Sequence, residues 1–365
     1  MAQSLRHMIA LSMVDKVGPV LAKYLVSYCG GVEEVFESSE KELSKIPNIG
    51  PATIKKLKDK SIFDKADKQL EFIANKGITG HTFLDDTYPR RLKNFETSPI
   101  VIYFNGKGEL NHRRTVGIIG TRKPTERGDI ICRKIVKGLV PYDVQIISGL
   151  AYGIDSLAHK YAVEEGIPTI GVLGHGHDII YPATNRGLAQ KMLPTGGTLT
   201  EFCIKSRIDK EHFPMRNRII AAMSDAVIVI ESARKGGSII TAEFANQFNK
   251  DVFAVPGRTS DEYSEGCNKL IKQHKAHLLE SAADIAYIMR WEEIDQQKNV
   301  QTALFVELDD QEQKVVDLLK AHPEINIDEL NYKLQLTSSS LAAVMINLEF
   351  KGVIKCLPGK KYIVI

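Results

Sequence analysis

The apolar residues of the chain follow three patterns, which change near residues 77 and 290. Residues 1–76 show short stretches with apolar positions at helical spacing. From about 112 to 286, short and nearly continuous apolar runs alternate with helical stretches, and residues 309–365 return to helical spacing before two strand-like runs. We therefore expect a helical domain at 1–76, an α/β domain at 77–290, a linker at 291–308 and a small domain at 309–365.

The middle segment predicts a doubly wound, Rossmann-like α/β domain. Nearly continuous apolar strands separated by helices are typical of a parallel sheet that helices cover on both faces. Two further strand-like runs, 78–84 and 100–104, precede this alternation. The strands expected within it are 115–120, 144–148, 169–174, 198–202, 226–231 and 251–255.

The N-terminal segment contains two glycine-proline turns, Gly18-Pro19 and Gly50-Pro51, each just before an amphipathic helix. Glycine supplies the unusual backbone angle of such a turn, and proline suits the first turn of a helix. The pair resembles tandem helix-hairpin-helix motifs, in which backbone N–H groups hold a DNA phosphate. A purely structural helical module explains the same turns equally well.

The C-terminal segment predicts a winged helix. Its expected helices are 310–321, 327–334 and 337–351, and two strands follow around residues 354 and 362–365. The third helix would be the recognition helix, and Lys351 is its only cation. Because a helix that reads DNA usually carries more positive charge, this module is expected to face a protein.

The distribution of charge places any polyanionic partner at the middle of the chain. The net charge is only +3, but residues 81–290 carry 28 lysines and arginines against 23 acidic residues, whereas residues 307–365 carry 7 against 9. The five cysteines form no CxxC pair, which fits a reducing cytosol. No apolar run approaches the roughly 20 residues of a membrane span, and no secretory signal is recognisable, so a cytoplasmic location is expected.

Three glycine-rich turns follow expected strands, at the sheet edge where doubly wound folds bind ligands. The first turn offers N–H groups, a hydroxyl and two cations to a phosphate, and the other two are similar strand-to-helix turns. None matches the GxGxxG or Walker patterns, so no nucleotide cofactor is expected. The candidate residues are Gly120, Thr121, Arg122 and Lys123 in the first turn, Ser148 and Gly149 in the second, and Gly237 and Ser238 in the third.

A fourth segment, residues 205–218, places one aromatic residue, Phe213, among cations. Cations that hold a backbone and a ring that stacks on an unpaired base are what a single nucleic-acid strand requires. Lys210 and Phe213 are expected in the loop before the helix that carries Arg216, Asn217 and Arg218. A solvated charged loop explains the segment equally well on these residues alone. The cations are Lys205, Arg207, Lys210, Arg216 and Arg218, and Asn217 lies between the last two.

A metal site is not expected. His175 and His177 lie two residues apart in a glycine-rich turn, and no third or fourth ligand is obvious nearby. Asp155 and His159, which follow the second glycine-rich turn, are better explained by helix capping and packing.

Taken together and in this order, these segments resemble the DNA-processing protein A (DprA/Smf) family over roughly residues 80–290. The flanking units also fit that family's helical N-terminal domain and C-terminal winged helix. The matching segments are GTRKPT (120–125), SGLAYGIDSLAH (148–159), Tyr181-Pro182 with Asn185, Phe213-Pro214 with RNRIIA (216–221), GGSIITA (236–242), AVPGR (254–258) and GCNKLI (266–271).

The resemblance implies a non-catalytic protein that binds incoming single-stranded DNA during natural transformation. It also implies loading of the RecA recombinase against single-strand-binding protein, and a homodimer formed through the Rossmann-like domain. The family's phosphate-binding arginine falls on Arg122, its strand-contacting lysine on Lys210 and its aromatic on Phe213. Tyr152 stands where the family usually has arginine, which removes one expected phosphate contact.

Two other functions remain open at this point. Rossmann-like nucleotide hydrolases of the lysine-decarboxylase-like type carry PGGxGTxxE at a similar turn. Here the turn lacks the second Gly-Thr, and Glu243 is out of register. The other alternative is a protein-interaction adaptor, which the acidic winged helix favours in part.

Overall fold

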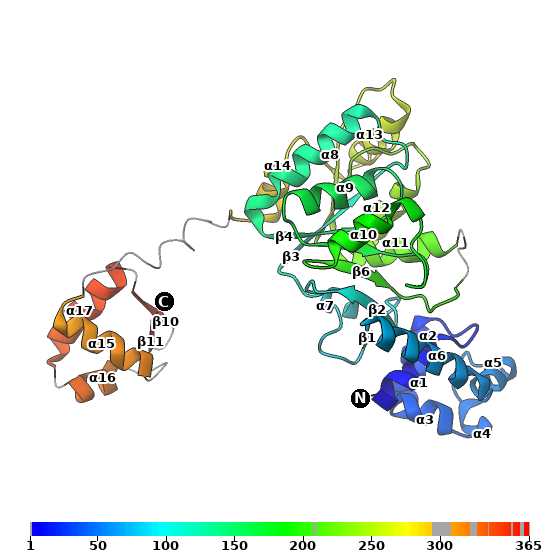
Figure 1. The fold of residues 1–365 in the computed structure, drawn as a ribbon, viewed down its shortest axis with the longest axis horizontal. Helices are drawn as coiled ribbons and strands as arrows, with labels where there is room; N and C mark the ends of the chain where they lie inside the picture. The colour runs from blue at the N-terminus through cyan, green and yellow to red at the C-terminus, as the bar shows by residue number, and fades with distance from the viewer. Residues whose placement is uncertain are drawn as a thin grey trace. The chain divides into compact units, whose positions relative to one another are not determined.

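The chain forms two units, Met1–Ile294 and Asp295–Ile365, in a computed structural model (Figure 1). None of the helices in the described residues has the length and apolar character needed to cross a bilayer. The structure describes residues 2–206, 209, 211–293, 308–321, 327–334, 336–351, 353–357 and 361–364.

The larger unit is built on one nine-stranded sheet in the order β1-β2-β6-β5-β4-β3-β7-β8-β9. The strands from β6 to β9 pair in parallel, and β1 and β2 add an antiparallel extension beside β6. All six strands expected in the α/β segment are present, and so are the two that precede it. The strands are β1 (Thr79–Thr82), β2 (Val101–Gly106), β3 (Arg114–Ile119), β4 (Val144–Ser148), β5 (Thr169–Val172), β6 (Gly197–Thr200), β7 (Ala226–Val229), β8 (Asp251–Ala254) and β9 (His277–Leu278).

Helices cover both faces of the parallel strands, which confirms the doubly wound fold. One apolar cluster joins α8, α9 and α14 to one face, and a second joins α11, α12 and α13 to the other. Every residue of β3, β4 and β5 is buried, including the polar Arg114 and Gln145, as expected for strands that helices cover on both faces. The helices are α7 (Arg90–Lys93), α8 (Glu126–Gly138), α9 (Ile154–Glu164), α10 (Arg186–Met192), α11 (His212–Met223), α12 (Gly237–Gln247), α13 (Glu265–Lys272) and α14 (Ala282–Met289).

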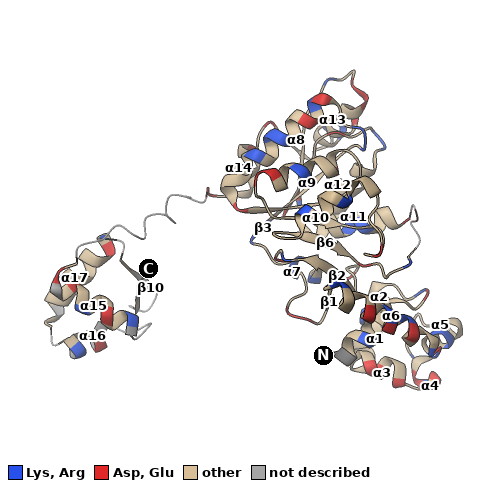
Figure 2. Cartoon of the chain, viewed as in Figure 1, with Lys and Arg blue, Asp and Glu red and all other residues tan. Residues whose placement is uncertain are grey.

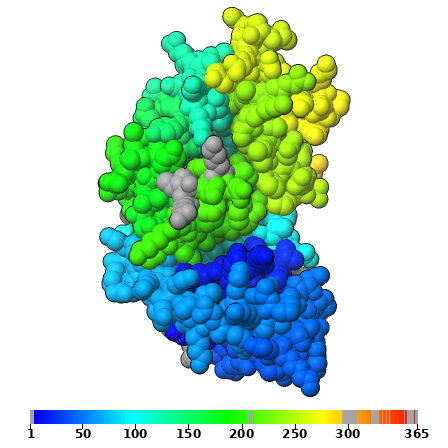
Figure 3. All heavy atoms as spheres, turned by 90° about the vertical axis from the view of Figure 1, so that its right-hand side faces the viewer, coloured from blue at the N-terminus to red at the C-terminus, as the bar shows by residue number. Residues whose placement is uncertain are grey.

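The N-terminal helices pack against the antiparallel edge of the sheet, where their apolar residues share one cluster with Val101 and Tyr103 of β2 (Figure 3). Both glycine-proline turns precede helices, α2 and α5, as predicted. Acidic side chains gather on α3 and α4, whereas α5 carries Lys55 and Lys56 (Figure 2). The helices are α1 (Ala2–Ser12), α2 (Pro19–Cys29), α3 (Val32–Glu37), α4 (Glu40–Leu43), α5 (Pro51–Leu57) and α6 (Ser61–Lys76).

The smaller unit is the predicted winged helix, with a core of its own. Lys351, the one cation of the expected recognition helix, lies 2.6 Å from a carboxylate oxygen of Glu312, which is buried. The pairing reduces the positive charge that this end of the helix offers to DNA. The elements are α15 (Asp310–Ala321), α16 (Ile327–Leu334), α17 (Ser338–Phe350), β10 (Ile354–Leu357) and β11 (Lys361–Val364).

Candidate functional site

A cavity of about 360 Å³ opens where the winding of the sheet reverses, at the carboxyl ends of β3 and β7. From β3 the chain crosses to β4 on one side, and from β7 it crosses to β8 on the other, so the two following loops separate and leave a crevice. Residues from the ends of both strands, from the turn after β4, from the start of α9, from α11 and from the start of α12 line it. The lining residues include Arg122, Tyr152, Asp155, Phe213, Arg216, Asn217, Ser232, Gly237 and Ser238.

The turn after β3 is pressed against the start of α9. Ile154 N donates to the carbonyl of Thr121 at 3.1 Å. Gly153 has φ +80°, and a Cβ there would lie 2.2 Å from the same carbonyl oxygen, so glycine is required. A Cβ on Gly120 would lie 2.5 Å from a side-chain carbon of Ile154. This close packing fixes the turn and leaves the side chain of Arg122 exposed at the rim of the cavity.

Arg122 lies beside an aromatic group. Its guanidinium carbon is 5.3 Å from the ring centroid of Phe213, within cation–π range. The ring of Tyr181 is 6.4 Å from that of Phe213, and a smaller pocket that adjoins the cavity is lined by these three residues and Tyr152. Tyr152 and Tyr181 are 46% and 44% exposed. A cation and three accessible rings therefore share one surface, which we call the Arg122 platform.

Helix α11 begins earlier than the sequence suggested. We expected Phe213 in the loop before this helix, but the helix starts at His212 and includes Phe213 in its first turn. Pro214 is compatible with this position because backbone N–H groups in the first turn have no partner within the helix. Phe213 is half-buried, so its ring both anchors the helix and faces the cavity. Lys210 lies outside the described residues.

Arg216 forms the floor of the cavity instead of its surface. It is 4% exposed, and it donates to the carbonyls of Gly149 and of Val172, the latter at 2.5 Å. Burial lowers the pKa of Arg216 to about 10, and burial raises the pKa of the neighbouring Asp155. The two opposite charges compensate each other, so Arg216 mainly holds the ends of β4 and β5 together.

Three other candidate residues lie away from the cavity lining. Ser148 is buried, and its hydroxyl donates to the carbonyl of Ile118 at 2.6 Å. Arg218 forms an ion pair with Glu201 and donates to the carbonyl of Thr97 at 2.6 Å. Lys123 is exposed next to Arg122 but does not line the cavity.

The start of α12 presents backbone N–H groups to the cavity. Its N-cap residue is Gly236, and no side chain caps the helix. Gly237 and Ser238 both line the cavity, as does Asn217 of α11. The Ser238 hydroxyl donates to that of Ser232 at 2.7 Å. An uncapped helix start with unpaired N–H groups favours an anion such as a phosphate.

Sequence reasoning did not assign Tyr152, Tyr181 or Ser232 to the site. The first two appeared in motif segments, but nothing in a motif shows that an aromatic side chain stays exposed. Their positions in separate loops after β4 and β5 become one surface only through the parallel sheet.

The two histidines of the turn after β5 make protein contacts. His175 Nε2 accepts from the backbone N–H of Tyr181 at 3.2 Å, and His177 Nε2 lies 3.1 Å from the hydroxyl of Thr198. Burial lowers the pKa of His177 to about 4. Among the described residues, no group of three or more His, Cys, Asp or Glu side chains is placed to hold a metal ion.

Comparison with known proteins places this geometry in a family. The family model for DNA recombination-mediator protein A matches residues 80–290, which include every residue of the cavity lining. The chain belongs to this family. The models for the DprA winged helix domain and for a SAM-like helix-hairpin-helix tandem match residues 302–360 and 8–60.

Curated relatives agree with that assignment. Protein Smf of Synechocystis sp. is 38% identical over 271 residues, 73% of this chain and 68% of that protein. The DNA processing protein DprA of Streptococcus pneumoniae is 38% identical over 204 residues, 56% of this chain and 72% of that protein.

Two solved structures of the family are similar to the chain. The X-ray structure of DprA from Streptococcus pneumoniae gives a TM-score of 0.67 at 30% identity and covers 79% of this chain and 99% of its own. DNA processing protein A from Helicobacter pylori, whose structure was described for its single-stranded DNA binding mode, gives a TM-score of 0.54 at 26% identity and covers 59% and 97%.

Proposed function

We propose that the chain binds single-stranded DNA across the Arg122 platform. The observation that carries this proposal is the guanidinium of Arg122 beside the ring of Phe213, with two exposed tyrosines, at the switch point of the sheet. A strand with unpaired bases requires cations for its phosphates and rings for its bases, and both lie here on one surface. The Helicobacter pylori relative, described as binding single-stranded DNA, supports the same ligand.

The chemistry divides between two sets of groups. Arg122, with Lys123 and Lys210 as further cations, neutralises phosphates, and the uncapped start of α12 accepts another. Phe213, Tyr152 and Tyr181 offer stacking surfaces that do not distinguish one base from another, because every base has a π-face. Binding is therefore tolerant of sequence and sensitive to salt.

We infer that the site binds and does not catalyse. Among the described residues that line the cavity, Asp155 is the only carboxylate, and it lies buried beside Arg216. Glu243, the residue nearest to the hydrolase pattern, is exposed and does not line the cavity. Incubation with nucleoside monophosphates is expected to release no free base, and released base that disappears in an Asp155→Asn variant would establish a hydrolase instead.

The wider role that we propose is protection of incoming DNA and loading of the RecA recombinase in natural transformation and recombination. The family's description as a recombination mediator supports this role, as do relatives named DNA processing proteins. We also propose a cytoplasmic homodimer that works beside single-strand-binding protein. The winged helix would face a protein partner, because its recognition helix carries little free positive charge.

Photochemical crosslinking tests the location of the site. A single strand with 5-bromodeoxyuridine in place of thymidine is irradiated with the full-length protein, and the crosslinked peptides are mapped. We expect crosslinks at Tyr152, Tyr181 or Phe213, because these rings would stack on the bases. Crosslinks confined to residues 1–76 or 309–365 would contradict the proposal.

A further inference from the structure

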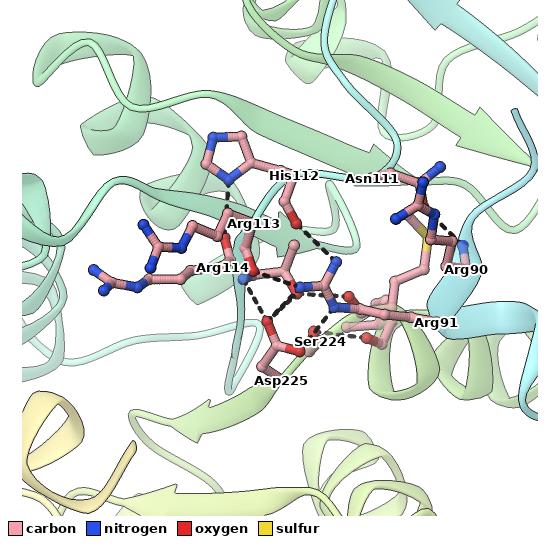
Figure 4. Close-up of polar contacts among 11 residues, drawn as sticks. Arg90, Arg91, Asn111, His112, Arg113, Arg114, Ser224 and Asp225 are labelled. Carbon is pink, nitrogen blue, oxygen red and sulfur yellow. Dashed lines mark hydrogen bonds and ion pairs between the residues drawn. The ribbon is translucent and has the colours of Figure 1, made fainter. Parts of the chain in front are cut away.

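We propose that a second phosphate-binding surface lies at the amino ends of the parallel strands, at the other end of the sheet from the Arg122 platform. It binds the backbone of the same DNA strand once that strand is long enough. The surface surrounds an open cavity of about 380 Å³ beside the amino ends of β3 and β7 (Figure 4). It extends the proposed single-strand binding and rests on it. The residues that line this cavity are Arg90, Arg91, Asn94, Asn111, His112 and Arg113.

Arg91 stabilises this surface through hydrogen bonds within the protein. Arg91 pairs with both carboxylate oxygens of Asp225, at 2.8 and 2.6 Å, and donates to the carbonyls of His112 and Arg113 at 2.8 and 3.0 Å. Asp225 also accepts from the backbone N–H of Thr115 at 2.9 Å. These bonds fix the loop before β3 against α7 and against the start of β7. The charge of Arg91 is thereby neutralised.

Two neighbouring arginines are held in place but remain unpaired. The backbone N–H of Arg90 donates to the side-chain oxygen of Asn111 at 2.7 Å, which ties α7 to the same loop. Within the described ranges, the exposed guanidinium groups of Arg90 and Arg113 have no ion-pair or hydrogen-bond partner. Figure 4 shows them on either side of Arg91. Because the backbone of both residues is already fixed, binding of a ligand has to order only their side chains.

The nearby carboxylates contact groups other than Arg90 and Arg113. Asp225 is paired with Arg91, and Asp143 lies 3.4 Å from the ring of His112. Lys93 of α7 is exposed as well, and Lys250, whose pKa burial lowers, lies near Arg91 and Asp225. Arg90 and Arg113 lie on either side of Arg91 and do not converge on one point (Figure 4). Such an arrangement suits successive phosphates of a polynucleotide better than one small anion.

The separation of the two sites sets a length requirement. The Arg122 platform follows the carboxyl end of β3, and Arg113 directly precedes its amino end. A strand of six residues spans about 20 Å. A short oligonucleotide that fills the platform therefore does not reach the second surface, whereas a longer one does. Binding to the second surface should appear as a gain in affinity with strand length.

The test is a length series of oligothymidines titrated by fluorescence anisotropy at several salt concentrations. The variant is Arg90→Ala/Arg113→Ala, and the matched control is Lys65→Ala/Lys68→Ala, which removes two exposed charges from α6. We expect the variant to match the parent on short strands and to lose the gain on long ones. On long strands its salt slope should fall by about 1.4, since each phosphate contact to a single strand contributes about 0.7.

Other outcomes separate the two proposals. If the parent binds short strands but the variant shows the same gain with length, the second surface does not contact DNA, and an acidic protein becomes the better partner. A loss shared equally with the Lys65→Ala/Lys68→Ala control would mean a general charge effect and would also overturn the inference. A parent that binds no strand of any length would contradict the proposed function itself. Melting temperatures establish that each variant is folded.

Discussion

Arg122 and Arg216 line the same cavity but have different roles. Arg122 is exposed beside Phe213, whereas Arg216 is buried and bonded to backbone carbonyls. In the sequence both are simply arginines in glycine-rich or basic segments. Only the burial of Arg216 against Gly149 and Val172 shows that its guanidinium bonds within the protein and is not available to a ligand.

Arg122→Ala is expected to weaken binding of every single strand alike, because it removes one phosphate contact. The salt slope should fall by roughly 0.7 to 1 unit. The melting temperature should stay at that of the parent, since the guanidinium is exposed. Anisotropy titrations at two salt concentrations measure both quantities, with Lys134→Ala on α8 as a control that removes an exposed charge elsewhere. An unchanged slope would mean that Arg122 contacts no phosphate.

Phe213→Ala should weaken DNA binding by a different route from Arg122→Ala. Loss of a stacking ring costs roughly 1–3 kcal/mol of binding free energy and leaves the salt slope nearly unchanged. Because the ring is half-buried, the melting temperature should also fall somewhat. Phe213→Tyr, which keeps a ring, serves as the matched control. A Phe213→Ala protein that binds as tightly as the parent would remove the stacking role.

A substitution at the start of helix α12 can separate an effect on DNA binding from an effect on folding stability. A Cβ on Gly237 would meet nothing within 4 Å, so a side chain fits there. Gly237→Asp places a carboxylate at the start of the helix, which favours the helix by about 0.3–1 kcal/mol but repels a phosphate. We expect a melting temperature equal to or above that of the parent and weaker DNA binding. Gly237→Asn, of the same size but neutral, should bind more tightly than Gly237→Asp; equal affinities would place the strand away from this helix.

The elements themselves were largely predictable from the sequence. Nearly continuous apolar runs identified β3 to β8, because buried parallel strands leave no polar face. β9 was missed because it has only two residues, His277 and Leu278, and both are exposed. The start of α11 was placed too late, since basic residues followed by Phe213-Pro214 resemble a loop. The Arg122 platform could be predicted only in part, because Tyr152 and Tyr181 reach it through the order of the strands.

For the whole molecule, the two units have separate apolar cores, so their roles can be tested by truncation. A protein ending at residue 294 is expected to keep most of its affinity for single strands, because the winged-helix segment is net negative. A partner-dependent activity, such as loading of RecA onto strands coated with single-strand-binding protein, should be impaired. A truncated protein that melts normally but loses most of its affinity would assign the winged helix to DNA.

We expect this chain to prefer single-stranded over duplex DNA. One titration tests it most directly: the full-length protein is added to a labelled single strand and to the duplex of the same sequence, each at two salt concentrations. We expect tighter binding to the single strand, little dependence on base sequence and a steep loss of affinity with salt, because bound phosphates release counterions. Equal affinity for the duplex, or an affinity that does not change with salt, would contradict single-strand binding through phosphate contacts and stacked bases.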